Sequence, residues 1–296
     1  MARFEGSMVA IVTPLKDGVV DLRTYRELCE WHLSEGTDVL VPCGTTGESA
    51  TLTAAEKADV IRATVEVVRG RVPVIAGAGS NATHEVIEQV KAARSLGADA
   101  ALVVTPSYNR PTQEGLFRHY QAIAEATRFP VIAYNVPGRT TVDLGVDTTA
   151  RLAQAGAIVG LKDATGSMDR QVQLVERIGQ GGFAYISGDD ATITPYIALG
   201  GQGVISVVAN VAPRATRELV AVARRGDFKA ALERQVKLAE LIRSLFLETS
   251  PAPAKAALQL MGRCSAEVRL PLAPVFDATL ARVREALTRL GLLGAA

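Results

Sequence analysis

One lysine stands at the end of an apolar run, where a cation has no obvious structural purpose. Lys162 closes the stretch "AIVGLK" (157–162). The other six lysines fall in helical patterns or a loop, positions that favour a solvated side chain: Lys16, Lys57, Lys91, Lys229, Lys237 and Lys255. Because burying an unpaired ammonium is costly, Lys162 is either paired with the adjacent Asp163, extended into solvent from the rim of a sheet, or kept for chemistry.

The chemistry that suits such a lysine is amine catalysis. A neutral amine attacks a ketone, loses water and forms a Schiff base that stabilises a carbanion at the neighbouring carbon. Tyr134 ends the preceding apolar run and is a candidate proton relay, or else an interior aromatic residue with a satisfied hydroxyl. The turn "GTTGE" (44–48) offers backbone N–H groups and two hydroxyls to a carboxylate, although Gly and Thr also fill ordinary turns.

Short runs rich in Val, Ile and Ala alternate with longer amphipathic segments, which is typical of βα units around a parallel sheet. We predict eight strands, at 7–12, 38–42, 72–77, 100–104, 130–134, 157–162, 183–187 and 203–208. Glycines such as Gly36 and Gly97 mark helix ends, and Thr53 and Glu56 have the spacing of a capping box. Eight such units predict a closed (β/α)8 TIM barrel, with an open doubly wound sheet as the alternative.

Beyond Arg225 the strand pattern stops, and three helical patterns follow at about 227–248, 253–262 and 275–290. The predicted organisation is therefore a catalytic (β/α)8 barrel at 1–225 and a C-terminal helical extension, or appendage, at 226–296. The uncharged stretch 191–213 is long enough to cross a bilayer, but Pro195, Gly200, Gly201 and Asn210 interrupt it. It is interpreted as a helix, a turn and a strand.

Composition narrows the class of protein. Apolar residues make up 48% of the 296 residues and the net charge is +1, so a globular core is expected and neither nucleic acid nor a membrane surface is an expected partner. Cys29, Cys43 and Cys264 lack CxxC spacing, and Glu5 interrupts any signal-peptide pattern, which together favour reduced thiols and a cytoplasmic location. The histidines lack ligand-like spacing, so no metal site is expected.

Five motifs follow the predicted strands in order, at the ends where barrel enzymes place their reacting groups. They are "GTTGES" (44–49), "TPSYNRP" (105–111), "YNVPGRT" (134–140), "GLKDATG" (160–166) and "SGDDA" (187–191). Through these motifs the chain resembles, over essentially its whole length, the dihydrodipicolinate synthase family of the pyruvate-dependent class I aldolase and N-acetylneuraminate lyase superfamily. The resemblance implies condensation of pyruvate with L-aspartate 4-semialdehyde to 4-hydroxy-tetrahydrodipicolinate, toward diaminopimelate and lysine.

The resemblance also implies catalytic roles. Lys162 matches the Schiff-base lysine and Tyr134 the tyrosine that relays protons to it. Thr45 matches the middle member of that relay, and Tyr108 the residue that reaches in from a neighbouring subunit. A residue borrowed in this way implies an oligomer, which in the family is a homotetramer built from two tight dimers. No cofactor is implied beyond the covalent pyruvate Schiff base on Lys162.

Four further positions match substrate-binding residues of the family. Thr46, together with Thr45, lies in the turn that holds the pyruvate carboxylate. Gly188 and Ile205 match positions whose main-chain oxygens line the site. Arg139 matches the residue that receives the carboxylate of the semialdehyde, a role that suits a planar guanidinium.

Other functions stay open at this point. N-acetylneuraminate lyase and 2-keto-3-deoxygluconate aldolase share the lysine and tyrosine but act on sugar acids, and the sugar-acid lyases usually lack an arginine at the place of Arg139. A non-catalytic keto-acid-binding barrel is a third possibility. A pyridoxal phosphate enzyme also uses a lysine, but the glycines of "GAGSNATHE" (77–85) are explained by a turn before a helix capped at Asn81.

The sequence departs from family members that lysine inhibits. In those members the product binds a cleft at the tight-dimer interface, and the cleft positions that match here are Ser49, Ala50, Asn81 and Glu85. Ala54 and Lys57 replace histidines of the enterobacterial type, and Ser107 replaces a tyrosine. Like-charge repulsion from Lys57 and the loss of an aromatic wall at Ser107 predict weak inhibition or none.

Overall fold

Eight parallel strands form one sheet in the computed structural model, which describes residues 4–293. The strands are β1 (Gly6–Ala10), β4 (Val39–Val41), β5 (Ile75–Ala78), β6 (Ala100–Val104), β7 (Val131–Asn135), β8 (Gly160–Asp163), β9 (Ala184–Ser187) and β10 (Gly203–Ser206). Their order is β4-β1-β10-β9-β8-β7-β6-β5, and a parallel bridge from Leu40 to Val74 joins the two ends. The sheet therefore closes, which confirms the (β/α)8 barrel over the open doubly wound sheet.

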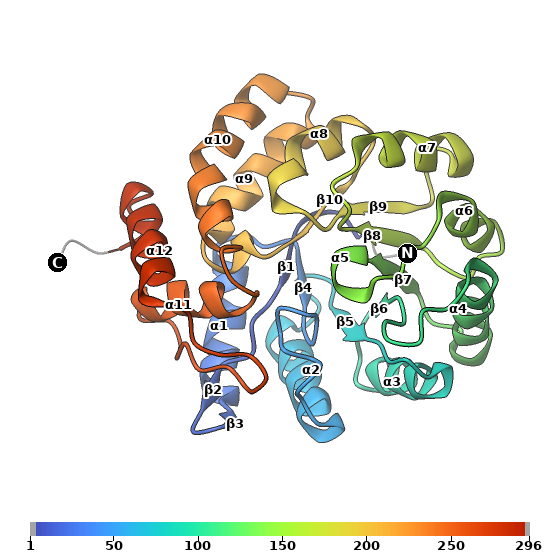
Figure 1. The fold of residues 1–296 in the computed structure, drawn as a ribbon, viewed down its shortest axis with the longest axis horizontal. Helices are drawn as coiled ribbons and strands as arrows, with labels where there is room; N and C mark the ends of the chain where they lie inside the picture. Colours follow the sequence, from blue (N-terminus) through green and yellow to red (C-terminus); the bar gives the residue numbers. More distant parts are fainter. Residues whose placement is uncertain (1–3, 294–296) are drawn as a thin grey trace.

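Helices surround the strands (Figure 1). The helix that follows each strand in turn is α1 (Leu22–Ser34), α2 (Ala54–Val68), α3 (Thr83–Ser95), α4 (Gln113–Thr127), α6 (Val146–Gln154), α7 (Met168–Ile178), α8 (Ile193–Ala198) and α9 (Pro213–Arg224). Short turns of helix precede three of these, namely α5 (Pro137–Thr140), η1 (Asp190–Thr192) and η2 (Val208–Asn210). Among the described residues, no helix is long and apolar enough to cross a membrane.

Each predicted strand overlaps an observed one. The stretch 191–213 contains α8, a turn and β10, as expected. Thr53 and Glu56 form the predicted capping box at the start of α2, and Gly36 and Gly97 have positive φ angles. A small antiparallel hairpin, β2 (Leu15–Lys16) with β3 (Val19–Val20), was not predicted, because two residues a strand are too few to show alternation.

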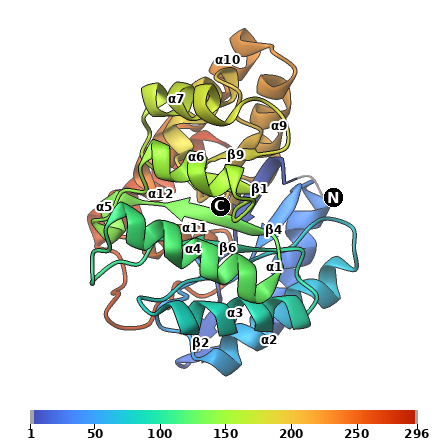
Figure 2. The same ribbon diagram turned by 90° about the vertical axis from the view of Figure 1, so that its right-hand side faces the viewer.

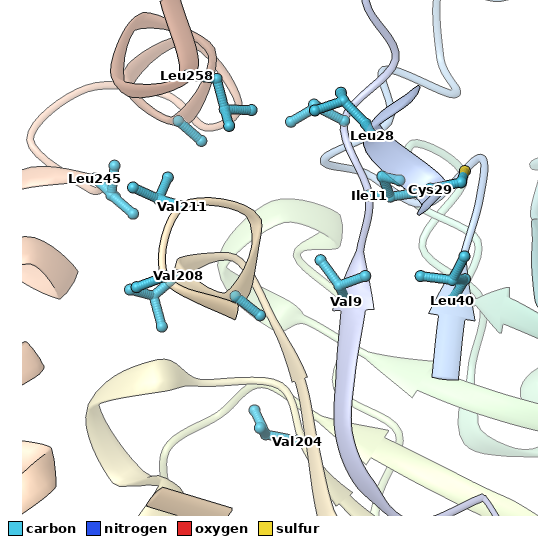
Figure 3. Packing of buried hydrophobic residues seen from close by; sticks show 14 of the residues in the cluster. Val9, Ile11, Leu28, Cys29, Leu40, Val204, Val208, Val211, Leu245 and Leu258 are labelled. Atoms are coloured by element: carbon cyan, nitrogen blue, oxygen red, sulfur yellow. The ribbon is translucent and has the colours of Figure 1, made fainter. Parts of the chain in front are cut away.

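The C-terminal segment forms α10 (Phe228–Ser244), α11 (Ala252–Leu260) and α12 (Asp277–Arg289), close to the three predicted ranges. In Figure 1 α11 and α12 lie to one side of the barrel, beside α1. Their apolar residues share one hydrophobic cluster with the barrel. Figure 3 shows Leu245 and Leu258 beside Val208 and Val211, which follow β10. The tail is thus packed against the carboxyl end of the first and last barrel strands.

A separate cluster fills the barrel itself. Met8, Ile75, Leu102, Ile132 and Ile186 are among its buried members, each from a different strand. Tight packing of branched side chains makes the interior a solid core, as is usual for such barrels. Reactive groups are therefore confined to the mouth at the carboxyl ends of the strands.

Candidate functional site

Lys162 and Tyr134 lie side by side at the carboxyl end of the barrel. The register of β7 and β8 places Tyr134 opposite Lys162, so the two side chains leave the sheet on the same face. Lys162 Nζ lies 4.1 Å from the centre of the Tyr134 ring. The two residues are 6% and 7% exposed, respectively, so the amine meets an aromatic face in a largely dry environment.

Asp163 is not the partner of Lys162. Its Oδ2 accepts a hydrogen bond from Arg170 Nε at 2.6 Å, and its Oδ1 accepts one from the Thr165 backbone N–H at 2.9 Å. Arg170, at the start of α7, also donates to the Leu144 carbonyl. Within residues 4–293 Lys162 forms no ion pair or hydrogen bond through its side chain. Its low exposure also excludes the solvated alternative, so the amine is left free for chemistry.

The turn that carries Thr45 and Thr46 follows β4 and is held by its own backbone. The Gly47 N–H donates to the Gly44 carbonyl at 3.1 Å, and the Glu48 N–H donates to the Thr45 carbonyl at 3.1 Å. Thr13 Oγ1, from the end of β1, donates to the Gly47 carbonyl at 2.8 Å. Thr46 is buried and Thr45 half-buried, so Thr45 is the more accessible of the two threonines.

The close approach of β5 beneath this turn requires a glycine. A Cβ atom added to Gly77 would lie 2.0 Å from the Cys43 carbonyl oxygen. The Gly77 N–H meanwhile donates to the Pro42 carbonyl at 2.8 Å. The turn is therefore supported directly by the neighbouring strand.

A buried ion pair beside the turn was missed by the sequence analysis. Lys255 is 0% exposed, and its Nζ donates to Glu48 Oε1 at 2.7 Å and to the Thr13 carbonyl at 2.9 Å. The prediction of a solvated Lys255 is therefore wrong. The signal was present in α11, whose sequence "APAKAALQL" is apolar on every side and so indicates a buried helix.

Gly188 directly follows β9, the neighbour of the strand that carries Lys162, and Ile205 lies on β10, one strand further along the sheet. The Gly188 N–H donates to the Asp163 carbonyl at 2.7 Å, and a Cβ at this position would lie 2.8 Å from that of Ala164. Ile205 on β10 is buried in the same interior cluster as Tyr134. The structure thus places both residues at the barrel mouth, on the far side of Lys162 from Tyr134 in strand order.

Arg139 and Tyr108 stand further out. Arg139 lies on α5, directly after β7, and Figure 2 shows α5 at the left edge, beyond the tip of the strand that precedes it. Its exposed guanidinium has Nη2 3.4 Å from the Ser250 carbonyl oxygen. Tyr108 follows β6, is 91% exposed, and forms no side-chain hydrogen bond within residues 4–293. One chain therefore brings Lys162 and Tyr134 together and leaves Tyr108 outside.

Asn81 does not cap a helix, so that prediction is wrong. Helix α3 begins at Thr83 with Ala82 as its N-cap and without a side-chain cap bond. Asn81 Oδ1 instead accepts hydrogen bonds from Ser107 N at 2.9 Å and from Ser107 Oγ at 3.0 Å. Glu85 accepts a hydrogen bond from the Ser80 hydroxyl. Asn81 thus joins the loop after β5 to the loop that carries Tyr108.

A closed (β/α)8 barrel with a buried, unpaired lysine beside a tyrosine at its mouth defines an enzyme of the lysine-dependent aldolase class. Among residues 4–293, no group of three or more His, Cys, Asp or Glu side chains is arranged to hold a metal ion. The sequence comparison is more specific. The chain belongs to the Dihydrodipicolinate synthetase family, whose model matches residues 3–290.

Relatives of known name agree with this placement. The chain is 71% identical, over 99% of both sequences, to a 4-hydroxy-tetrahydrodipicolinate synthase of Anaeromyxobacter sp. (strain Fw109-5). A dihydrodipicolinate synthase from Acinetobacter baumannii, solved in complex with pyruvate, is 49% identical with a TM-score of 0.96, and 98% of this chain and 100% of that one align. A lysine-bound DHDPS from Cyanidioschyzon merolae is 37% identical with a TM-score of 0.95, covering 99% of this chain and 100% of that one.

Proposed function

We propose that this enzyme condenses pyruvate with L-aspartate 4-semialdehyde to form 4-hydroxy-tetrahydrodipicolinate. The observation that carries the proposal is the buried Lys162 amine, which has no ionic partner within the described chain and lies 4.1 Å from the Tyr134 ring centre. The names of the relatives support the reaction. The pyruvate-bound structure of the Acinetobacter baumannii relative supports pyruvate as the first substrate.

The first half of the reaction uses the amine. The Lys162 nitrogen attacks C2 of pyruvate, the carbonyl oxygen leaves as water after two protonations, and a C2 imine remains. Loss of a proton from C3 then gives an enamine, because the cationic imine accepts the electron pair of that C–H bond. The enamine carbon attacks the aldehyde carbon of the second substrate, and the new C–C bond forms as the aldehyde oxygen takes a proton.

The second half returns the lysine. The amino group of the semialdehyde displaces the Lys162 nitrogen from C2 and closes a six-membered ring, so no atom of the enzyme is consumed. Each step moves a proton within a small, dry site, which requires a fixed relay. We assign the relay to Tyr134, with Thr45 as its middle member and Tyr108 supplied by a neighbouring subunit. The 91% exposure of Tyr108 supports a donor that acts across an interface.

Substrate carboxylates need separate binding groups. We assign the pyruvate carboxylate to the turn with Thr45 and Thr46, where hydroxyls and backbone N–H groups are concentrated. Arg139 suits the carboxylate of the semialdehyde, because its exposed guanidinium lies on α5, next to the strand that carries Tyr134. The main-chain oxygens of Gly188 and Ile205 complete the wall of the site.

The proposal includes a homotetramer that works in the cytoplasm without a cofactor other than the covalent pyruvate. The exposed Tyr108 supports the oligomer. Cys29, Cys43 and Cys264 are free thiols, which is typical of proteins in a reducing compartment.

An assay with two aldehydes tests the proposal. Pyruvate consumption is followed with L-aspartate 4-semialdehyde or with N-acetylmannosamine as the second substrate. We expect turnover only with the semialdehyde, because Arg139 provides a cation for its carboxylate. Turnover only with the amino sugar would make this chain a sugar-acid lyase, and pyruvate binding without turnover of either aldehyde would make it a binding protein.

A further inference from the structure

Lys255 and Glu48 join two parts of the chain that are far apart in sequence. Lys255 lies on α11 of the C-terminal tail, and Glu48 lies in the turn after β4. Their charged atoms are 2.7 Å apart, and the two side chains are 0% and 1% exposed. The pair is therefore wholly removed from water, unlike the exposed ion pairs on the outer helices.

Every charged atom of the pair has a partner. Lys255 Nζ donates also to the Thr13 carbonyl at 2.9 Å, and Glu48 Oε2 accepts from the Arg269 backbone N–H at 3.0 Å. The Arg269 side chain in turn donates to the Thr51 carbonyl at 3.0 Å and to Glu56 at the start of α2. The C-terminal tail thus contacts the segment 48–56 at its first residue, Glu48, and at its last residue, Glu56.

Glu48 and Thr13, which both contact Lys255, are each joined to the proposed carboxylate-binding turn by one hydrogen bond. The Glu48 N–H donates to the Thr45 carbonyl at 3.1 Å. Thr13, whose carbonyl accepts from Lys255, donates its own hydroxyl to the Gly47 carbonyl at 2.8 Å. Glu48 also has a φ of 56°, an unfavourable angle for a residue with a side chain, and so needs contacts that hold it there. The ion pair therefore supports the turn in two ways. Glu48 bonds to Thr45 directly, and Lys255 acts through Thr13, which bonds to Gly47.

A purely stabilising role explains these features poorly. Replacing a buried ion pair by apolar side chains of similar volume is often neutral for stability or favourable, because desolvation offsets the attraction. An ion pair supplies a directed bond that fixes one backbone position, whereas an apolar contact does not. Here the fixed position is Glu48, the residue that directly follows the Gly-Thr-Thr-Gly turn.

We propose that Lys255 and Glu48 are positioning residues that hold the turn of Thr45 and Thr46 in the geometry that binds the pyruvate carboxylate. This role rests on the proposed function, since it presupposes that pyruvate binds there. It also gives the C-terminal tail a part in substrate binding. The tail reaches the second substrate region too, because the Ser250 carbonyl lies 3.4 Å from Arg139 Nη2.

The test uses Glu48→Gln/Lys255→Met, which removes both charges together and keeps the side-chain volumes. The matched control is Glu240→Gln/Arg282→Met, which removes a partly exposed ion pair between α10 and α12 of the same tail. For each protein the melting temperature is measured, and pyruvate is titrated with borohydride to trap the imine. The turnover number with the semialdehyde is measured at saturating pyruvate.

We expect the double variant at Glu48 and Lys255 to need at least about 10-fold more pyruvate for half-maximal trapping, equivalent to about 1.4 kcal/mol. Turnover at saturating pyruvate should also fall, because the displaced turn carries Thr45, the middle member of the proposed proton relay. The control variant should match the unaltered protein both in the pyruvate concentration for half-maximal trapping and in turnover. A folded double variant with unchanged half-saturation would overturn the positioning role.

Two further outcomes are decided in the same experiment. If the double variant does not fold, Glu48→Asp alone replaces it, since this change keeps the charge beside Lys255 but shortens the side chain by one methylene, and a rise in half-saturation in the same direction is expected. An unchanged value there overturns the role. Absence of trapping in the unaltered protein would refute the proposed function itself, whereas trapping with unchanged half-saturation in the variants refutes only the positioning role.

Discussion

Arg170 pairs with Asp163, the carboxylate next to Lys162. Loss of this ion pair should destabilise the folded protein strongly. In Arg170→Met, Asp163 would lose the guanidinium at 2.6 Å and keep only the Thr165 N–H as a hydrogen-bond donor to its side chain. The two side chains are 10% and 3% exposed, so the remaining charge would be buried without an ionic partner. The Leu144 carbonyl would also lose its Arg170 donor and keep only the longer hydrogen bond from Thr149 Oγ1 at 3.5 Å.

The expected cost follows from that burial. Removing one partner of a buried ion pair costs about 3–5 kcal/mol, because the other charge stays desolvated. Against a total stability of about 5–15 kcal/mol, this is a large fraction. At about 2–4 °C for each kcal/mol in large domains, a loss of about 3–5 kcal/mol should lower the melting temperature by about 6–20 °C. Thermal unfolding followed by circular dichroism measures it.

Helix α7 supplies a matched control. Arg177 on the same helix pairs with Asp147 at 3.0 Å, but these side chains are 58% and 76% exposed. Arg177→Met should cost at most about 1 kcal/mol. Asp163→Asn combined with Arg170→Met should recover part of the loss, because no charge then stays buried. An Arg170→Met variant that melts within about 2 °C of the unaltered protein would refute the reasoning.

Three more predictions concern substrate, pH and inhibition. Arg139→Ala should lower kcat/KM for the semialdehyde by about 30- to 1,000-fold, while borohydride trapping of pyruvate is unchanged; equal loss of both would make Arg139 a scaffold residue. Arg269 hydrogen-bonds Glu56 and lowers the pKa of that carboxyl from 4.5 to about 2, so the resulting stability is present above about pH 4.5 and is lost as the pH falls toward 2. Melting curves at pH 5 and pH 3 should therefore show a smaller acid-induced drop in Arg269→Met than in the unaltered protein; an equal drop would contradict the assignment. L-lysine should half-inhibit turnover only above about 1 mM at subsaturating pyruvate, because Lys57 adds a like charge and Ser107 lacks an aromatic ring, and half-inhibition below that concentration would show the prediction wrong.

The barrel could be predicted because its information is local. Each strand is a short run of Val, Ile and Ala, and each helix that follows is amphipathic, so the alternation shows in a single pass along the chain. The strand-end position of Lys162 follows from the same pattern. Since parallel strands of a barrel all end at one mouth, the sequence alone indicated that Lys162 and Tyr134 would share it.

The missed features depend on partners far away in sequence. Lys255 can be buried because it pairs with Glu48, which lies 207 residues away in sequence. No local sequence pattern indicates that partner. Asn81 has the residue type of a helix cap, but Ser107 in another loop takes its side-chain oxygen. Such pairings are set by tertiary structure, which overrides local preference.

The central claim is that the Lys162 amine forms an imine with pyruvate. Incubation with pyruvate and borohydride, followed by proteolysis and mass spectrometry, tests it most directly. We expect one reduced three-carbon adduct on the protein, located on Lys162, and none in Lys162→Ala. An unmodified Lys162, or an adduct that persists in Lys162→Ala, would contradict the account.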